Sequence, residues 1–159
     1  MNLTAVPLKL PAEGNLVMGH SHFIKTAEDL AEIAAVVPGA KFGVAFCEAS
    51  GPCLIRADGN DAELIAVATA NAESVAAGHT FFLALRGAFP ITMLNAVKAC
   101  PEVCTIHCAT GNPVQAIVAE TEQGRGVLGV IDGAPPKGIE DAEARDKRRE
   151  FLRAIGYKR

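Results

Sequence analysis

Short apolar runs alternate with amphipathic segments along most of this chain. The run Phe42–Cys47 is apolar at nearly every position, which is typical of a buried strand. His79–Leu85 and Val103–Ala109 have a similar length and composition and also predict strands. Further strands are predicted over residues 3–10, 16–18, 53–57, 114–121 and 127–132. Pro7 and Pro11 confine the first of these to a sheet edge, because proline cannot donate to a ladder.

Four other segments have the periodicity and end signals of helices. Thr26 followed by Asp29 predicts a capping box at the start of the first helix. Asn60 and Glu63 mark the start of the second, which has a stripe of small apolar residues. The last helix has acidic residues early and basic residues late, an order that suits the helix dipole. Helices are therefore predicted over residues 26–37, 60–77, 89–100 and 139–155.

These elements predict an α/β fold. About seven strands and four helices are expected, with helices separating the early strands and hairpins late in the chain. A chain of 159 residues suits one domain with a sizeable core. We therefore expect residues 1–159 to form a single domain, a layered α/β sandwich in which helices pack on a mixed β-sheet.

Composition and charge limit the kinds of partner that this protein is expected to bind. Half of the residues are hydrophobic and the mean hydropathy is positive, so we expect apolar surface to be covered in a homo-oligomer. The net charge of −3 and the lack of a long basic run argue against nucleic-acid binding. No apolar run approaches the ~20 residues of a membrane helix, and no leader pattern is evident. We expect a cytoplasmic protein that binds a small molecule and no membrane.

The five cysteines contain no Cys-x-x-Cys pair, so we expect reduced thiols. Cys100, Cys104 and Cys108 recur every four residues with His107 beside them, a spacing that invites a zinc interpretation. Pro101 interrupts any helix that would present all three on one face. Cys104 and Cys108 are better explained as inward positions of a strand, and no metal site is predicted.

Polar side chains follow the buried strand that ends at Cys47. Glu48 and Ser50 supply a carboxylate and a hydroxyl, and Gly51 and Pro52 supply a turn. In open α/β sheets, ligands bind beyond such strand ends. An ordinary surface turn, in which Ser50 bonds nearby backbone, is the alternative.

His22 and Lys25 come just before the first predicted helix. Backbone N–H groups and the dipole make a helix N-terminus suited to anions, including phosphate. An imidazole can attack a phosphoryl group, and Lys25 could hold its oxygens. In the alternative interpretation His22 bonds a backbone carbonyl and Lys25 is solvated.

A glycine-rich turn separates the last two strands. Gly124, Gly126 and Gly129 satisfy the spacing Gly-x-Gly-x-x-Gly, but a strand follows where a dinucleotide-binding motif requires a helix. A hairpin that covers phosphates with backbone amides is geometrically closer, although such glycines also serve turns that need positive φ. No Walker A sequence occurs. Asp132 is a candidate Mg²⁺ ligand or a turn former.

Several of these segments together resemble one family. The residues that carry the resemblance are Gly19–Thr26, Phe46–Pro52, Gly78–Phe81, Thr110–Pro113, Glu120–Gly126 and Ile155–Lys158. In this order they are similar to the adenosine-specific kinase family. His20 stands where the pattern has Gln, and Cys53 where it has Arg, which removes a cation that could help to hold phosphate.

The resemblance implies an adenosine nucleotide, ATP or AMP, as ligand, with Mg²⁺ as a candidate companion, and a homotrimer. We expect phosphoryl transfer through a phosphohistidine at His22, with His79 as the nearest competitor and Lys25 assisting. The expected nucleotide-binding residues are Glu48, Ser50, Gly51, Asn112, Gly124, Arg125 and Gly126. These groups and Asp132 are expected to converge on one cleft with apolar walls from Phe42, Phe46, Phe81, Phe82 and Phe89. A non-catalytic AMP-binding sensor and a purely structural oligomer are the alternatives.

Overall fold

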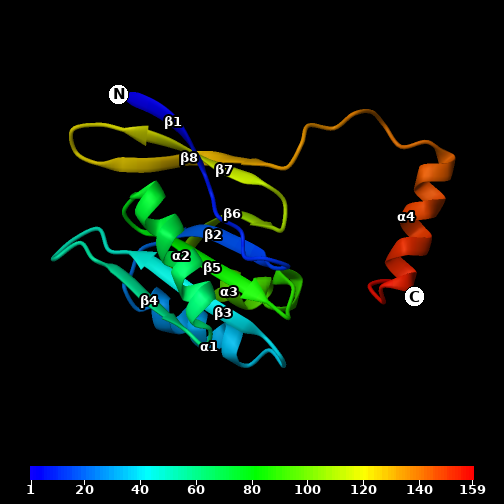
Figure 1. Ribbon diagram of the computed structural model, residues 1–159, viewed down its shortest axis with the longest axis horizontal. Coiled ribbons are helices and arrows are strands. Elements are labelled where there is room, and N and C mark those ends of the chain that lie inside the picture. Colours follow the sequence, from blue (N-terminus) through cyan, green and yellow to red (C-terminus); the bar gives the residue numbers. More distant parts are fainter.

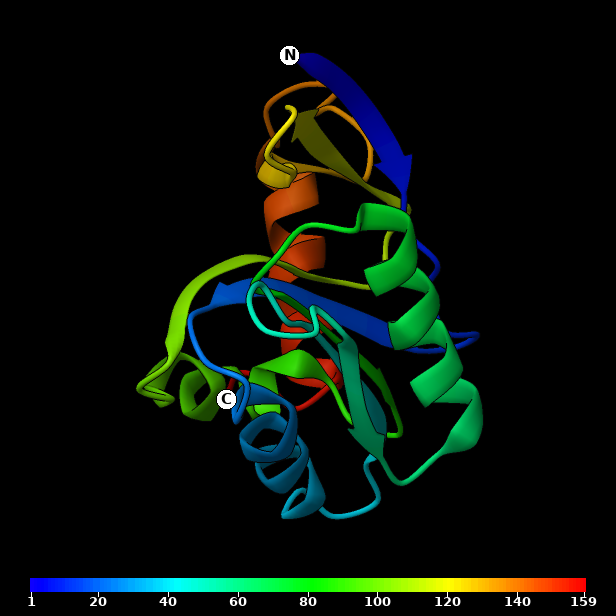
Figure 2. The same cartoon turned by 90° about the vertical axis from the view of Figure 1, so that its left-hand side faces the viewer.

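The computed structural model describes residues 1–159 as two β-sheets with helices packed around them (Figures 1 and 2). The strands are β1 (Asn2–Pro7), β2 (Asn15–Ser21), β3 (Lys41–Cys47), β4 (Ile55–Gly59), β5 (Thr80–Arg86), β6 (Val103–Thr110), β7 (Val114–Glu120) and β8 (Arg125–Asp132). The helices are α1 (Thr26–Ala35), α2 (Ala62–Val75), α3 (Leu94–Ala99) and α4 (Ala142–Ala154), with a short 3-10 helix, η1, at Pro90–Thr92.

A five-stranded antiparallel sheet forms the centre, in the order β4-β3-β5-β2-β6. Its inner strands are buried on both faces, which explains their nearly continuous apolar runs. In β5, Phe81 and Leu83 face one hydrophobic cluster, whereas Phe82 and Ala84 face the other. Because side chains alternate between the two faces of a strand, consecutive residues of β5 pack into two different hydrophobic clusters.

Different elements cover the two faces of this sheet. On one face, α2 packs beside the three-stranded antiparallel sheet β1-β7-β8, so that Leu64 and Ala68 share a cluster with Ala116 and Val118. On the other face, α1 and α3 supply residues such as Leu30. The stripe of small residues predicted for α2 lets this helix lie close to the sheet.

The α/β fold class is confirmed. The expected strands divide between two sheets, and every observed ladder is antiparallel. The N-terminal strand lies at an edge and ends at Pro7, as its prolines predict. β2 extends beyond the predicted Leu16–Met18, and Val17 and Met18 are fully buried in the middle of the sheet.

Both predicted helix starts differ in their capping groups. The capping box at Thr26 is wrong: Lys25 is the N-cap without a side-chain bond, and the Thr26 hydroxyl donates to the carbonyl of Phe23 at 2.6 Å. Asp61 caps α2 by accepting from the N–H groups of Glu63 and Leu64 at 3.1 Å. Other partners take both expected side chains: a nearby backbone carbonyl binds Thr26, and the Asn60 amide donates to Ala40 and accepts from Phe42 across the sheet edge.

The predicted third helix is divided into η1 and α3. The expectation that Cys104 and Cys108 both point inward is wrong for Cys104, which is exposed, whereas Cys108 is buried. The ladder between β2 and β6 shifts register twice, between Met18 and Gly19 and between His20 and Ser21. Each bulge inserts a residue and breaks the two-residue period that the prediction assumed.

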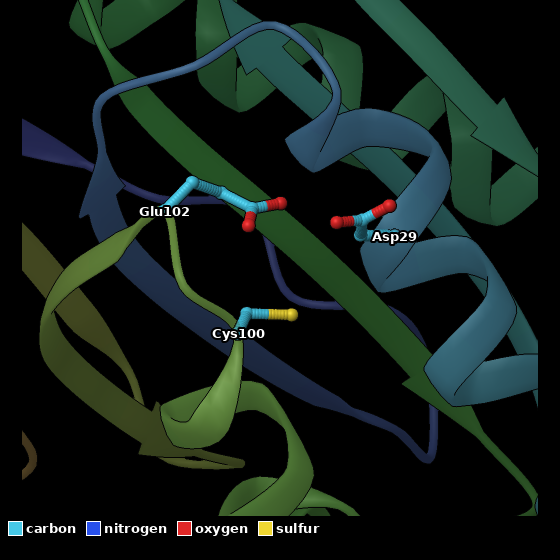
Figure 3. A group of neighbouring side chains, drawn as sticks. All are labelled: Asp29, Cys100 and Glu102. Atoms are coloured by element: carbon cyan, nitrogen blue, oxygen red, sulfur yellow. The ribbon is translucent and has the colours of Figure 1, made fainter.

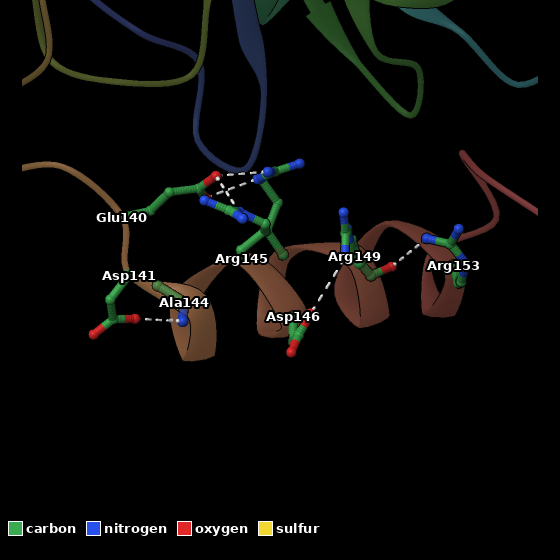
Figure 4. A network of polar contacts seen from close by, with 8 residues as sticks. Glu140, Asp141, Ala144, Arg145, Asp146, Arg149 and Arg153 are labelled. Atoms are coloured by element: carbon green, nitrogen blue, oxygen red, sulfur yellow. Dashed lines mark hydrogen bonds and ion pairs between the residues drawn. The ribbon is translucent and has the colours of Figure 1, made fainter.

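The C-terminal helix α4 stands apart from the two sheets at the end of an extended segment (Figure 1). None of its residues is buried. Figure 4 shows the local contacts that hold it: Asp141 accepts from the N–H of Ala144 at 2.8 Å, and Glu140 pairs with Arg145 at 3.7 Å. Among all the helices, none has both the length and the apolar character needed to cross a membrane.

Candidate functional site

An open cleft of about 550 Å³ lies where three segments meet. One wall is the loop after β3, which contributes Glu48, Ala49 and Cys53. The end of α2 and the start of β5 contribute Ala76 and Gly78. The opposite wall is the tip of the β7–β8 hairpin, with Ala119, Thr121, Gln123, Gly124, Arg125 and Gly126. The structure therefore brings the predicted strand-end loop and the predicted glycine-rich hairpin together.

A second, more apolar compartment of about 350 Å³ adjoins this cleft. The two share Glu48, Cys53, Ala76 and Gly78 as lining residues. The walls of the second compartment are otherwise formed by Cys47, Leu54, Ile55, Ala72, Glu73 and Ala77. A polar space and an apolar space thus lie side by side, and both volumes are in the range of small-molecule sites.

Glu48 organises the loop between them. Its carboxylate accepts from the N–H of Leu54 at 2.9 Å and from the guanidinium of Arg56 at 3.0 Å. The hydrogen bond from Leu54, followed by the contacts with Arg56, lowers the pKa of the Glu48 carboxyl, so this group is ionised at neutral pH. Ser50 and Gly51 are exposed at the turn and do not line the cleft.

Arg125 anchors the hairpin wall to α2. Its guanidinium donates to the carbonyl of Ser74 at 3.3 Å and lies 3.9 Å from the carboxylate of Glu120. Its Nε atom is buried and has no hydrogen-bond partner. A Cβ atom on Gly124 or Gly126 would meet nothing within 4 Å. The glycines therefore leave the backbone beside Arg125 open to the cleft.

His79 follows the cleft residue Gly78 directly, but its own side chain lines neither compartment. Its φ angle is +64°, its N–H donates to Cys47 at 2.7 Å, and its carbonyl accepts from Ser21 at 2.9 Å. The half-buried imidazole stacks on Phe46 and meets the ring of His20 edge-on, with centroids 6.0 and 5.9 Å away. Its backbone is therefore fixed from both sides in a conformation that is uncommon for a residue with a side chain.

His20 completes this pair of rings. Burial, followed by electrostatic repulsion from His79 and then His107, lowers the pKa of His20. Burial also lowers the pKa of His107. His20 and His107 are therefore neutral at pH 7 and add no positive charge beside His79.

His22 and Lys25 lie elsewhere. The exposed ring of His22 stacks on Phe23, and its backbone N–H donates to the carbonyl of Glu102 at 3.0 Å. Lys25 forms an ion pair with Asp29 and lies 3.7 Å from the carboxylate of Glu102. Neither His22 nor Lys25 lines the cleft. The catalytic role predicted for the two stays a prediction, but Lys25 is already engaged by carboxylates.

The expected convergence of all polar groups on one cleft is wrong within this chain. Asn112 and Asp132 are at the opposite end of the β7–β8 hairpin from Arg125, because Val114 pairs with Asp132 and Glu120 with Arg125. There, Asp132 accepts from Thr110 at 2.7 Å and from Asn112 at 3.4 Å. The hairpin is long enough to keep its two ends apart.

The expected phenylalanine walls are also wrong. Four of the five rings, those of Phe42, Phe46, Phe81 and Phe82, are at most 4% exposed in the core. Phe89 is 60% exposed but lies beside α3, outside the cleft. Strand interiors between two covered faces bury these four rings, so none of them can stack on a ligand in the cleft.

Several cleft residues were not singled out from the sequence. Thr121 and Gln123 belong to the glycine-rich turn, where their position between two strands is a usable signal. Ala76 ends α2 in the left-handed conformation and has no chemical signature at all. Leu54 and Ile55 are ordinary strand residues in the sequence. Only the packing of α2 against the loop turns these residues into a wall.

The fold and the cleft define a small α/β protein with an open, two-compartment cleft of the size of small-molecule sites. Residues 6–158 match the model of the family described as adenosine specific kinase, and the chain belongs to that family. It is also similar to the crystal structure of the PH1918 protein from Pyrococcus horikoshii OT3. That structure has 43% sequence identity and a TM-score of 0.94, over 99% of this chain and 98% of the other. No curated protein matches the chain.

Proposed function

We propose that this protein binds an adenosine nucleotide in the two-compartment cleft and transfers a phosphoryl group through a phosphohistidine. The observation that carries the proposal is the contact between a polar compartment and an apolar one. An adenine base needs apolar walls, and phosphates need donors. The base would lie between Leu54, Ile55 and Ala72, with the phosphates at the glycine-rich hairpin and Arg125. Family membership supports the same ligand class.

The geometry supports His79 as the phosphoryl acceptor in this proposal. It does not itself line either compartment, but it directly follows Gly78, which lines both, and its backbone is held by Cys47 and Ser21. An unprotonated ring nitrogen would form the N–P bond while the bond from the γ-phosphorus of ATP to the bridging oxygen breaks, and ADP leaves with that electron pair. Mg²⁺ would enter with ATP. His22 is the second candidate, motivated by its position before α1.

Intact mass spectrometry of the wild-type protein tests the chemistry. Incubation with ATP and Mg²⁺ should add the mass of one phosphoryl group, and acid should remove it, because a phosphoramidate is acid-labile. A protein that binds AMP without ever gaining this mass would be a non-catalytic sensor. A protein that binds neither AMP nor ATP would contradict the proposed site altogether.

Adenine nucleotides should bind roughly tenfold more tightly than guanine nucleotides, because Glu73 lines the apolar compartment and carries a carboxylate. It can accept from the 6-amino group of adenine, whereas guanine presents an acceptor oxygen there. Calorimetry with AMP and GMP measures the difference. Glu73→Gln should reduce the preference, since an amide can also donate. Glu63→Gln, on the exposed first turn of α2, is the matched control. Equal affinities in the wild type would refute the base assignment.

We also propose that copies of this chain assemble through α4, as a homotrimer in keeping with the family resemblance. The helix α4 has a distinct apolar side that no other part of this chain covers. Its Phe151 is 60% exposed, and Ile155 and Tyr157, which follow the helix, are 44% and 46% exposed. A helix of 13 residues is marginal in water without tertiary packing. A second copy would supply that packing.

Light scattering should therefore give a mass near three times the 16.6 kDa of one chain. Phe151→Asp combined with Ile155→Asp should shift the mass to that of the monomer, because it places charge in the buried contact. Glu150→Gln, on the same helix and also exposed in this chain, should leave the assembly intact. A wild-type monomer at micromolar concentration would disprove the assembly.

A further inference from the structure

A second group of reactive side chains lies on the far side of the sheet from the cleft. Asp29 comes from the first turn of α1, Cys100 from the residue after α3, and Glu102 from the turn that leads into β6. One ligand atom from each lies within 4.8 Å of the other two. Figure 3 shows the two carboxylates facing each other, with the thiol of Cys100 directed toward the same space.

Glu102 is the unusual member of this group. It is 1% exposed, and neither of its carboxylate oxygens has a hydrogen-bond partner. The one cation near it is the ammonium of Lys25 at 3.7 Å, which also pairs with Asp29 and is 47% exposed. An ionised carboxylate that is buried without hydrogen bonds is costly. This side chain therefore needs either a proton or a better-placed cation.

Burial and neighbouring negative charge raise the pKa of both the Glu102 carboxyl and the Cys100 thiol. Burial, followed by the interaction with Asp29, raises the pKa of the Glu102 carboxyl. Burial, followed by the charges of Glu102 and Asp29, raises the pKa of the Cys100 thiol. Without a further cation, the positive charge of Lys25 alone would have to balance the negative charges of Asp29, Cys100 and Glu102 when all three are ionised.

We propose that Asp29, Cys100 and Glu102 form a binding site for a divalent transition metal of the zinc class. A thiolate with two carboxylates is a donor set that zinc and cobalt accept and that magnesium and calcium disfavour. Three protein ligands and a water would complete a tetrahedral shell. Cys100 would bind as the thiolate, so binding releases its proton. Lys25 has a long, half-exposed side chain and would move toward solvent as the metal takes its place.

Such a metal would join two segments that are far apart in the sequence, the start of α1 and the loop between α3 and β6. It would fix the start of α1 to the end of α3 and to the first residues of β6. The carbonyl of Glu102 already accepts the backbone N–H of His22 at 3.0 Å. The site therefore also holds the segment that carries His22, and it does so independently of the nucleotide cleft.

Cobalt(II) titration of the metal-free, full-length protein tests the site. The wild type should develop a thiolate-to-cobalt charge-transfer band together with the visible bands of tetrahedral Co²⁺, and Zn²⁺ should abolish both. Cys100→Ser should lose the charge-transfer band. Cys53→Ser, which removes an exposed thiol in the cleft, should keep it. Glu102→Gln should weaken Co²⁺ binding at least tenfold.

Lys25→Met separates metal binding from a merely structural ion pair. Removing the competing ammonium should tighten Co²⁺ binding severalfold if the metal replaces it. The proposal is overturned if the wild type shows no charge-transfer band at saturating Co²⁺, or if the band survives in Cys100→Ser. The cluster would then be a pair of carboxyl groups that share a proton beside Lys25. Circular dichroism checks folding, and if Glu102→Gln does not fold, the two cysteine variants still decide the outcome.

Discussion

Replacing His79 with asparagine should abolish acid-labile phosphorylation by ATP while leaving AMP affinity within about tenfold of the wild type. The phosphoryl acceptor is lost, but the two compartments that hold the nucleotide are built from other residues. Asparagine is the suitable replacement because position 79 has a φ of +64°, and asparagine tolerates the left-handed region better than most residues. Alanine there would confuse loss of chemistry with backbone strain.

His22→Asn is the matched control for this experiment. It removes an exposed imidazole whose chain neighbours line neither compartment, whereas His79 adjoins the cleft residue Gly78, so the labelled fraction should equal that of the wild type. The measurement is intact mass, or retention of the γ-phosphate label, before and after acid treatment. Labelling that persists in His79→Asn but disappears in His22→Asn would move the chemistry to the segment before α1. Labelling that persists in both variants would exclude both histidines as the acceptor.

Gly43→Ala should destabilise the protein by at least about 3 kcal/mol, toward the upper end of overpacking effects. Gly43 is buried in β3, directly under α2. A Cβ atom there would lie 2.2 Å from the carbonyl carbon of Leu64 and from the nitrogen of Ile65. Both atoms are backbone, so no side chain can rotate away. The helix must lift from the sheet and lose part of the packing around Leu64 and Ala68.

Urea unfolding measures this loss, and Gly129→Ala is its control. Gly129 also lies in a strand, but a Cβ atom there meets nothing within 4 Å. Its replacement should be neutral or stabilise by up to about 1 kcal/mol, because alanine restricts the unfolded chain. A change of less than about 1 kcal/mol for Gly43→Ala would show that α2 can shift at little cost. Since α2 ends at the cleft, a lifted helix should also weaken AMP binding.

Local patterns predicted most of the elements. The apolar runs of β3 and β5 and the hairpin of β7 and β8 are correct to within a few residues, because burial on a sheet imposes composition directly on consecutive residues. The edge position of β1 follows from Pro7 in the same way. The motifs that resemble the adenosine-specific kinase family were likewise visible in the sequence, and the match over residues 6–158 confirms the family.

Pairings between distant segments decided the rest. Nothing local shows that Asp132 and Arg125 end up at opposite ends of one hairpin, since only the register with β7 separates them. The bulges that turn Cys104 outward depend on the partner strand β2. Likewise, Cys100 and Glu102 meet Asp29 through the docking of α1 beside α3, across roughly seventy residues of chain.

The choice between His22 and His79 illustrates the difference between what the sequence predicts and what the tertiary structure decides. In the sequence, His22 has the stronger setting, because a lysine and a helix start follow it. In the folded chain, Asp29 and Glu102 pair with Lys25, whereas the loop after β3 and the end of α2 form a cleft that Gly78 lines, one residue before His79. Composition and periodicity act through neighbours in the chain and determine which elements form. The site consists of residues that become neighbours only when those elements pack, so the tertiary structure alone determines its membership.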